Sequence, residues 1–397
     1  MLSRKQRGQA LFIALLLLTA GIGSWVFYMA DPSRLQRSSD EKTAAALAQA
    51  KEALIGWKLN DSNRPGVLPC PDTNEDGTAE AVSGVECPSY IGRLPWKTLG
   101  LPELRDGTGA SLWYALSRNF RNNASAEPVN TDTKGTLRVY SQTIATILTS
   151  QAVAVIFAPG TVLGNQDRSS SGTASCSAPS GTLAPNLCAA NYLETASSIN
   201  NAAAAGPYIA AQATASFNDK LLIVSAADVM IPVEKRAARE IINLLQLYKT
   251  YSASGCNCYP WADISDGVSN PGYTFGRVPL LGASPTNWSS LSTPIAIAPW
   301  LINNQWWWVF FYNIADSATA TPTSGKLGLN GVPNIIDVVL ITTGTAGASR
   351  PSGSPGSWSD TWWTSYVDDS NNSDLGINFF TPSSTAYDRD RIYTLLP

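Results

Sequence analysis

The residues best suited to chemistry lie in one short acidic stretch, DTNEDGTAE, at positions 72–80. It opens with the D-x-[DN]-x-[DN]-G pattern of calcium loops, in which oxygen ligands at alternate positions face one ion and a glycine allows a sharp turn. The twelfth position, a bidentate Glu in an EF-hand, is Ser83, so the full EF-hand pattern is broken. The pattern is therefore compatible with two interpretations, a Ca²⁺-binding loop and an acidic surface turn. The candidate ligands are Asp72, Asn74, Asp76, Thr78 and Glu80.

Six cysteines form three local pairs: Cys70 with Cys87, Cys176 with Cys188, and Cys256 with Cys258. An even count at such spacings favours disulfides made in an oxidising compartment. A bridge across the single residue between Cys256 and Cys258 would strain disulfide geometry, so this pairing is the weakest. A metal cluster is the alternative, but the pairs lack C-x-x-C spacing and the chain contains no His.

Two arginines, Arg93 and Arg277, occupy similar Gly-Arg-x-Pro segments. We expect each guanidinium to tie a loop to the body of the protein through hydrogen bonds to carbonyls, in preference to binding a ligand. Gly92 and Gly276, which precede them, are expected to supply turn conformations that other residues resist.

Nine of the thirteen tryptophans lie beyond residue 260. Neighbouring side chains on a strand point to opposite faces, so three consecutive tryptophans cannot all enter one core. Exposed aromatic faces would suit sugars, partner proteins or lipid headgroups, whereas burial would indicate a thick core under long loops. We expect most of them to be buried. The candidate ligand contacts are Trp306, Trp307, Trp308, Trp362 and Trp363.

The composition argues against enzymatic and nucleic-acid functions. Without His, the chain cannot form Ser-His-Asp or Cys-His sites or a His-ligated metal. A glycosidase that uses two carboxylates stays open. The formal net charge is −3, which gives no sign of a polyanion-binding face. We predict a protein that is not an enzyme and does not bind nucleic acid.

The N-terminal sequence indicates how the protein is attached to a membrane. Met1–Gly8 is a basic leader, and Ala10–Met29 is an uncharged stretch of about 20 residues, about 30 Å long as a helix. The cations before this stretch place the leader in the cytoplasm and the residues from Asp31 onward outside. A transmembrane helix over 9–29 is therefore expected, after a cytoplasmic leader over 1–8.

A basic leader that ends in Gly and abuts an apolar helix resembles the class III signal of type IV prepilins and type II secretion pseudopilins. The resemblance implies that prepilin peptidase cuts between Gly8 and Gln9, that Gln9 becomes methylated, and that the helix packs among those of other subunits. Ile13 stands where most major subunits have Glu. This departure favours a minor or tip-like subunit, or an uncut anchor. A plain signal-anchor helix is the alternative.

The rest of the chain repeats itself. Each unit contains a helix, a Pro- and Cys-containing turn with Asp-Gly, a Gly-Arg-x-Pro segment and an aromatic strand. Several matches in the same order indicate a tandem duplication, with boundaries at 30–232 and 233–397. The expected fold class is α+β: an N-terminal transmembrane helix followed by two tandem helix-plus-antiparallel-sheet domains that resemble pilin heads.

Together these features predict a non-enzymatic, membrane-anchored subunit of a type IV pilus or type II secretion-type assembly, in a minor, tip or accessory role. The expected location is the bacterial inner membrane, with a single pass and the body in the periplasm or on a surface filament. The expected partners are other pilin or pseudopilin subunits, prepilin peptidase and the membrane. The alternative is a membrane-tethered adhesin or glycan-binding module that uses its C-terminal tryptophans.

Overall fold

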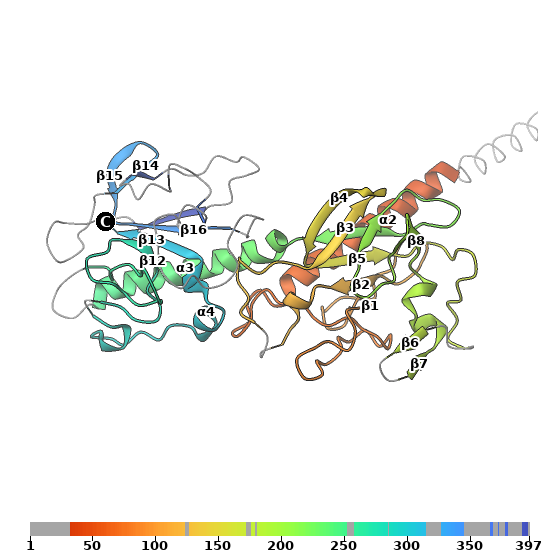
Figure 1. Cartoon of the computed structure of the whole chain (residues 1–397), viewed down its shortest axis with the longest axis horizontal. Helices are drawn as coiled ribbons and strands as arrows, with labels where there is room; N and C mark the ends of the chain where they lie inside the picture. The colour runs from red at the N-terminus through yellow and green to blue at the C-terminus, as the bar shows by residue number, and fades with distance from the viewer. Residues whose placement is uncertain are drawn as a thin grey trace, which may run out of the picture.

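The structure is a computed structural model. It describes residues 32–123, 127–171, 176–178, 181–251, 258–284, 286–314, 327–344, 366–367, 372, 378–379 and 391–395. Within these ranges the chain forms helices and several small sheets arranged as two similar halves along the long axis of the molecule (Figure 1).

The predicted fold class needs a correction. No helix in the described ranges is both long and apolar enough to cross a membrane. The two long helices, α2 (Pro32–Trp57) and α3 (Ala226–Tyr251), are too rich in charged and polar residues for a bilayer core. A fold class headed by a transmembrane helix is therefore wrong for the structure described, which is a mixed assembly of helices and sheets. The predicted segment 9–29 lies outside the described residues.

The first half is built on an antiparallel sheet with the strand order β1-β2-β5-β11. A three-stranded sheet, β10-β3-β4, lies beside it, with β10 and β3 parallel and β3 and β4 antiparallel. The strands are β1 (Ile91–Arg93), β2 (Trp113–Leu116), β3 (Leu137–Ser141), β4 (Thr143–Ala152), β5 (Ala154–Ala158), β10 (Tyr208–Ala210) and β11 (Lys220–Val224).

The second half repeats this order and these strand directions. Its main sheet is β12-β13-β16-β18, and its side sheet is β15-β14-β17, with β14 and β17 parallel. The strands are β12 (Phe275–Arg277), β13 (Phe310–Ile314), β14 (Leu327–Leu329), β15 (Val332–Ile336), β16 (Val338–Thr342), β17 (Asn378–Phe379) and β18 (Arg391–Leu395).

The first half also contains an insert between β5 and β10. It holds two small hairpins, formed by β6 (Cys176–Ala178) with β7 (Gly181–Leu183) and by β8 (Thr195–Ala196) with β9 (Ile199–Asn200). In the second half, a short helix, α4 (Pro299–Asn303), lies before β13.

The periodicity of the sequence explains how each half is layered. On α2, Leu47, Ala50 and Leu54 are buried at helical spacing, and this stripe packs on β5 and β11. In β5, Ala154 and Ile156 face the core under α2, while the alternate residues face the side sheet and the insert. Each half is therefore a helix, a main sheet and a side sheet in three layers, and β16 alternates between two cores in the same way.

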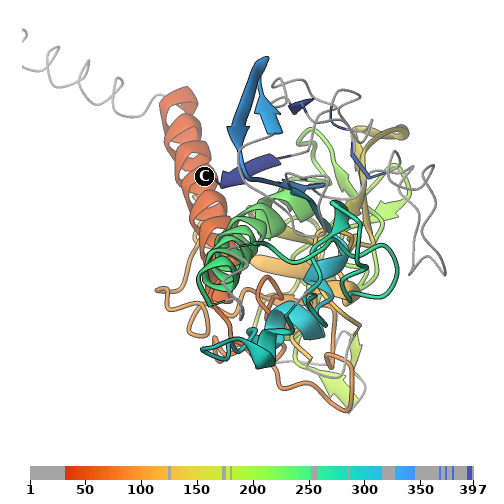
Figure 2. The same ribbon diagram turned by 90° about the vertical axis from the view of Figure 1, so that its left-hand side faces the viewer.

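One hydrophobic core joins the halves, because residues from α2, α3, β13 and α4 belong to the same buried cluster. Buried Asn304 strengthens the joint: its side chain accepts a hydrogen bond from Val129 N at 3.2 Å and donates to Asn63 O at 2.7 Å and Trp300 O at 2.9 Å. In the end-on view of Figure 2, α2 and α3 lie on the same side of the molecule, with the strands beyond them.

Candidate functional site

The acidic loop begins at Asp72, whose backbone pairs with Arg93 on β1 through hydrogen bonds of 2.6 and 3.0 Å. The buried Asp72 carboxylate accepts three hydrogen bonds from the loop's own amides: Asn74 N at 3.0 Å, Glu75 N at 2.8 Å and Gly77 N at 2.8 Å. Burial raises the pKa of Asp72, and the three amides act against this rise because they stabilise the charged form. The carboxylate therefore holds the loop in shape.

Asn74, Asp76 and Glu80, three of the other predicted calcium ligands, also accept hydrogen bonds within the loop, whereas Thr78 takes part through its backbone amide. Asn74 Oδ1 accepts from Asp76 N, Asp76 Oδ1 accepts from Thr78 N, and Glu80 Oε1 accepts from Thr73. Asn74 and Asp76 each cap the amide two residues further on, as in Asx turns, and Glu80 reaches back to Thr73.

The described geometry of the loop gives no direct support for a calcium site. Calcium takes six to eight oxygens that converge on one point. In the described part of the chain, no group of three or more His, Cys, Asp or Glu side chains could hold a metal ion. Calcium binding therefore stays a prediction from the sequence pattern, for which this geometry gives no support.

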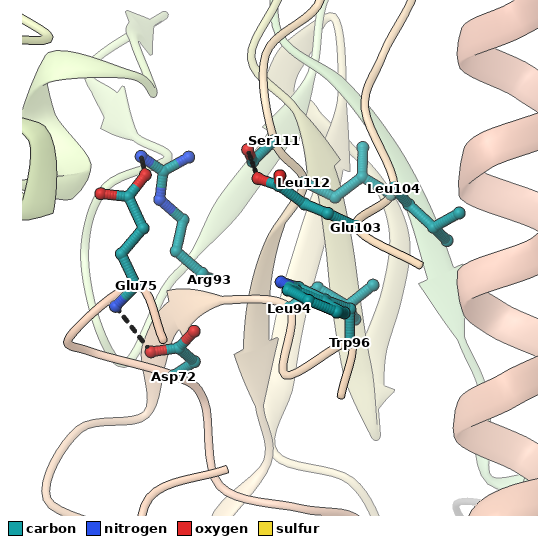
Figure 3. A pocket seen from close by; sticks show the side chains of 9 residues that line it. All are labelled: Asp72, Glu75, Arg93, Leu94, Trp96, Glu103, Leu104, Ser111 and Leu112. Atoms are coloured by element: carbon teal, nitrogen blue, oxygen red, sulfur yellow. Dashed lines mark hydrogen bonds and ion pairs between the residues drawn. The ribbon is translucent and has the colours of Figure 1, made fainter. Parts of the chain in front are cut away.

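Arg93 ties this loop to distant parts of the first half. Its buried guanidinium donates to Glu75 Oε1 at 3.2 Å and to Asn186 O at 3.0 Å. It also lies over the rings of Trp113 and Tyr192, 4.8 and 4.2 Å from their centroids. Figure 3 shows the guanidinium beside Glu75 and above Asp72. The arginine thus connects the acidic loop to the insert.

The second half contains the same arrangement around Asp263 and Arg277, which form the equivalent backbone pair. Asp263 Oδ1 accepts from Ser265 N at 2.7 Å and from Asp266 N at 3.0 Å. Arg277 Nε lies 3.5 Å from Asp263 Oδ2, and its guanidinium lies 3.9 Å from the ring centroid of Trp308. Burial raises the pKa of Asp263, while the charge of Arg277 acts to lower it.

Each unit is completed by a buried tyrosine on the strand that pairs with the arginine's strand, Tyr114 on β2 and Tyr312 on β13. Tyr114 and Tyr312 lie opposite Gly92 and Gly276, respectively, in the two sheets. Tyr114 donates to Pro69 O at 3.2 Å, and Tyr312 donates to Pro260 O at 2.9 Å. Both acceptors lie three residues before the loop aspartate, so the tyrosine holds the entry to the loop in both halves.

The predicted role of the two glycines was wrong. Gly92 and Gly276 lie in strands and do not have a positive φ. A Cβ on Gly92 would lie 2.4 Å from Asp72 O, and one on Gly276 would lie 2.2 Å from Asp263 O. These positions need glycine because the backbone of the loop approaches them closely.

A cleft of about 460 Å³ lies beside Arg93, and Arg105 and Arg168 also line it. Arg105 donates to Glu103 at 2.6 Å and Gly109 O at 2.8 Å. Arg168 donates to Gly160 O and Asn191 O, each at 2.9 Å. All three arginines thus hold loops in place. Each also has an acidic neighbour: Glu75 for Arg93, Glu103 for Arg105, and Glu194 for Arg168.

No known protein family, curated protein or solved structure matches this chain.

Two of the predicted disulfides are confirmed. Cys70 is bonded to Cys87, which closes the acidic loop, and Cys176 is bonded to Cys188, which closes the insert. Cys256 lies outside the described residues, so its pairing with Cys258 stays a prediction.

The predicted ligand-binding tryptophans fall into two groups. Trp306 is fully buried, Trp308 is buried, and Trp307 is half-buried against the same core. They form one turn of 3₁₀ helix, not a strand, so adjacent rings can reach one core. Trp362 and Trp363 lie outside the described residues, as do the processing residues Gly8 and Gln9.

Sequence reasoning missed Asn304, Glu194 and Asp219, which are buried polar residues with several hydrogen bonds. The only local signal was polar side chains beside hydrophobic segments, which is also typical of surface loops.

Proposed function

We propose that the protein is a non-enzymatic subunit of a type IV pilus or type II secretion-type assembly, in a minor, tip or accessory role. The proposal begins with the leader, because a basic segment that ends at Gly8 before an uncharged run is similar to prepilin signals. The body would work in the periplasm or on a surface filament, and the two disulfides are compatible with such an oxidising compartment.

The observation that carries the non-enzymatic part is the repeated aspartate–arginine unit. In both halves its charged groups are buried and bonded to the protein's own loops, at Asp72 and Arg93 and again at Asp263 and Arg277. Catalysis needs groups that are free to meet a substrate, whereas these groups fix the shape of a double head. A double head of fixed shape suits a subunit that presents surfaces to partners.

N-terminal mass spectrometry of the protein from its native host tests the assembly role. We expect a chain that starts at methylated Gln9 and copurifies with other pilin or pseudopilin subunits. Gly8→Leu should block the cut, while Ser3→Ala serves as a leader control that leaves it unchanged. A working protein that keeps Met1 and copurifies with no such subunit would contradict the proposal.

A further inference from the structure

Two carboxyl groups meet where the insert of the first half joins the main sheet. Glu194 belongs to the insert, directly before β8, and Asp219 directly precedes β11. Both residues are buried, with exposed fractions of 8% and 3%, respectively. Neither belongs to the repeated aspartate–arginine unit.

Reciprocal hydrogen bonds hold the pair together. Asp219 Oδ2 accepts from Glu194 N at 2.9 Å and from Asn201 Nδ2 at 3.0 Å. Glu194 Oε2 in turn accepts from Asn218 N at 2.9 Å and from Asp219 N at 3.2 Å. Glu194 Oε1 accepts from Gln166 Nε2 at 2.7 Å. Each carboxyl therefore binds the backbone of the other, and this link attaches the insert to the sheet.

Among the described residues, Asp219 Oδ1 is buried and has no hydrogen-bond partner, and the same is true of the neighbouring Asn218 Oδ1. A buried carboxylate oxygen without a partner is costly, and two adjacent carboxylates in a buried site do not both ionise readily. A proton on Asp219 would relieve both problems, because the side chain lies within hydrogen-bonding reach of Glu194 and the O–H would then be a donor to it.

The charged groups nearby fit this assignment. Arg168, from the first part of the insert, interacts electrostatically with both Glu194 and Asp106. Lys220, the next residue after Asp219, is exposed and pairs with Asp40 on α2. Burial raises the pKa of Asp219 well above its usual value, and the charge of Glu194 raises it further.

We propose that the Glu194–Asp219 pair holds one proton at neutral pH and acts as a proton-dependent link between the insert and the main sheet. A folded-state pKa above the unfolded value means that folding takes up a proton. The stability from the link is then complete below the ordinary pKa of Asp and is lost as the pH rises through the raised pKa of Asp219. The insert should hold most firmly in acid and loosen in alkali.

Melting curves of the full chain between about pH 5 and pH 9 test the link, because stability follows the difference in bound protons. We expect the wild-type melting temperature to fall as the pH rises and the fall to be clearly smaller in Asp219→Asn, whose amide mimics the protonated acid. Asp167→Asn, in an exposed residue of the same region, is the matched control and should keep the wild-type slope. Equal slopes in wild type and Asp219→Asn would overturn the proposal.

A second measurement needs only the wild-type protein. The infrared band of a protonated, buried carboxyl should be present at neutral pH and vanish at alkaline pH, together with hydrogen-exchange protection of the amides of Glu194 and Asp219. No such band at neutral pH would overturn the proposal. So would stabilisation by Ca²⁺ that EDTA reverses and Asp219→Asn abolishes, because a cation would then occupy the place assigned to the proton.

Discussion

At the scale of single residues, the two strand glycines show how close approach can make one residue type necessary. Gly276→Ala would place a methyl group against the carbonyl of Asp263, which is fixed by its pairing with Arg277. We expect this change to lower the free energy of unfolding by about 1–3 kcal/mol, as overpacking does. Chemical denaturation measures it. Gly56→Ala in α2, where a Cβ meets nothing within 4 Å, should instead stabilise the protein slightly. Equal effects would refute the close-approach argument.

The tryptophan cluster gives a second prediction at this scale. Trp306 is fully buried, and its ring packs against Trp300 and Phe310. Trp306→Ala should lower the free energy of unfolding by about 3–5 kcal/mol, as for other large buried aromatics. Half-buried Trp307→Ala should cost less. If Trp307→Ala left the melting temperature unchanged and abolished attachment to cells or glycans, the adhesin alternative would be the better description.

The acidic loop gives a third prediction. Because Asp72, Asn74 and Asp76 already cap loop amides, we expect calcium to leave the melting temperature unchanged relative to EDTA. Differential scanning calorimetry with and without the ion is the measurement. If calcium raised the melting temperature and Asp76→Ala removed this increase, the ion site suggested by the sequence pattern would be established.

At the scale of elements, a capping pattern in the sequence marks the start of α3, ahead of the proline inside the helix. α3 begins at Ala226 and includes Pro232, although a proline usually marks a helix start or break. Ser225 and Asp228 form a reciprocal cap, in which Ser225 Oγ accepts from Asp228 N at 3.2 Å and Asp228 Oδ2 accepts from Ser225 N at 2.8 Å. This S-x-x-D pattern is a local signal for the helix start, whereas Pro232 favours a later start.

The cap can be tested directly. Ser225→Ala should lower the free energy of unfolding by about 1 kcal/mol, because it leaves a helix amide without its acceptor. Thr250→Ala, at the exposed end of the same helix, removes only a hydroxyl bonded to Gln246 O and should have almost no effect. Equal losses in urea denaturation would show that the cap contributes little.

Other elements differ in how far sequence could predict them. The buried runs that became β5 and β16 were recognisable, because a short apolar segment bounded by turns indicates a central strand. The side-sheet strand β4 is harder to predict: its residues favour strands, but most of them are exposed and its apolar residues do not alternate. The contacts of Glu194 with Asp219 and of Asn304 with Asn63 join segments far apart in sequence, and no local pattern encodes them.

At the scale of the whole molecule, the shared core predicts that the two halves unfold together. We expect calorimetry to give a single transition whose calorimetric and van't Hoff enthalpies agree. Asn304→Ala should destabilise both halves, by about 2–4 kcal/mol, because it removes several hydrogen bonds and leaves buried backbone groups without partners. Asn200→Ala, in the exposed part of the insert, is the control. Two separate transitions in the wild type would contradict a common core.

The passage from one half to the other also has a mechanical consequence. Only Ser225 lies between the end of β11 and the start of α3, so no slack separates the last strand of one half from the helix of the next. Tension applied to the second half would therefore load β11 directly. Its five register pairs with β5 run along the strand, so they would share that load in shear instead of opening one at a time. A head built in this way should resist traction along its length better than its small sheets suggest.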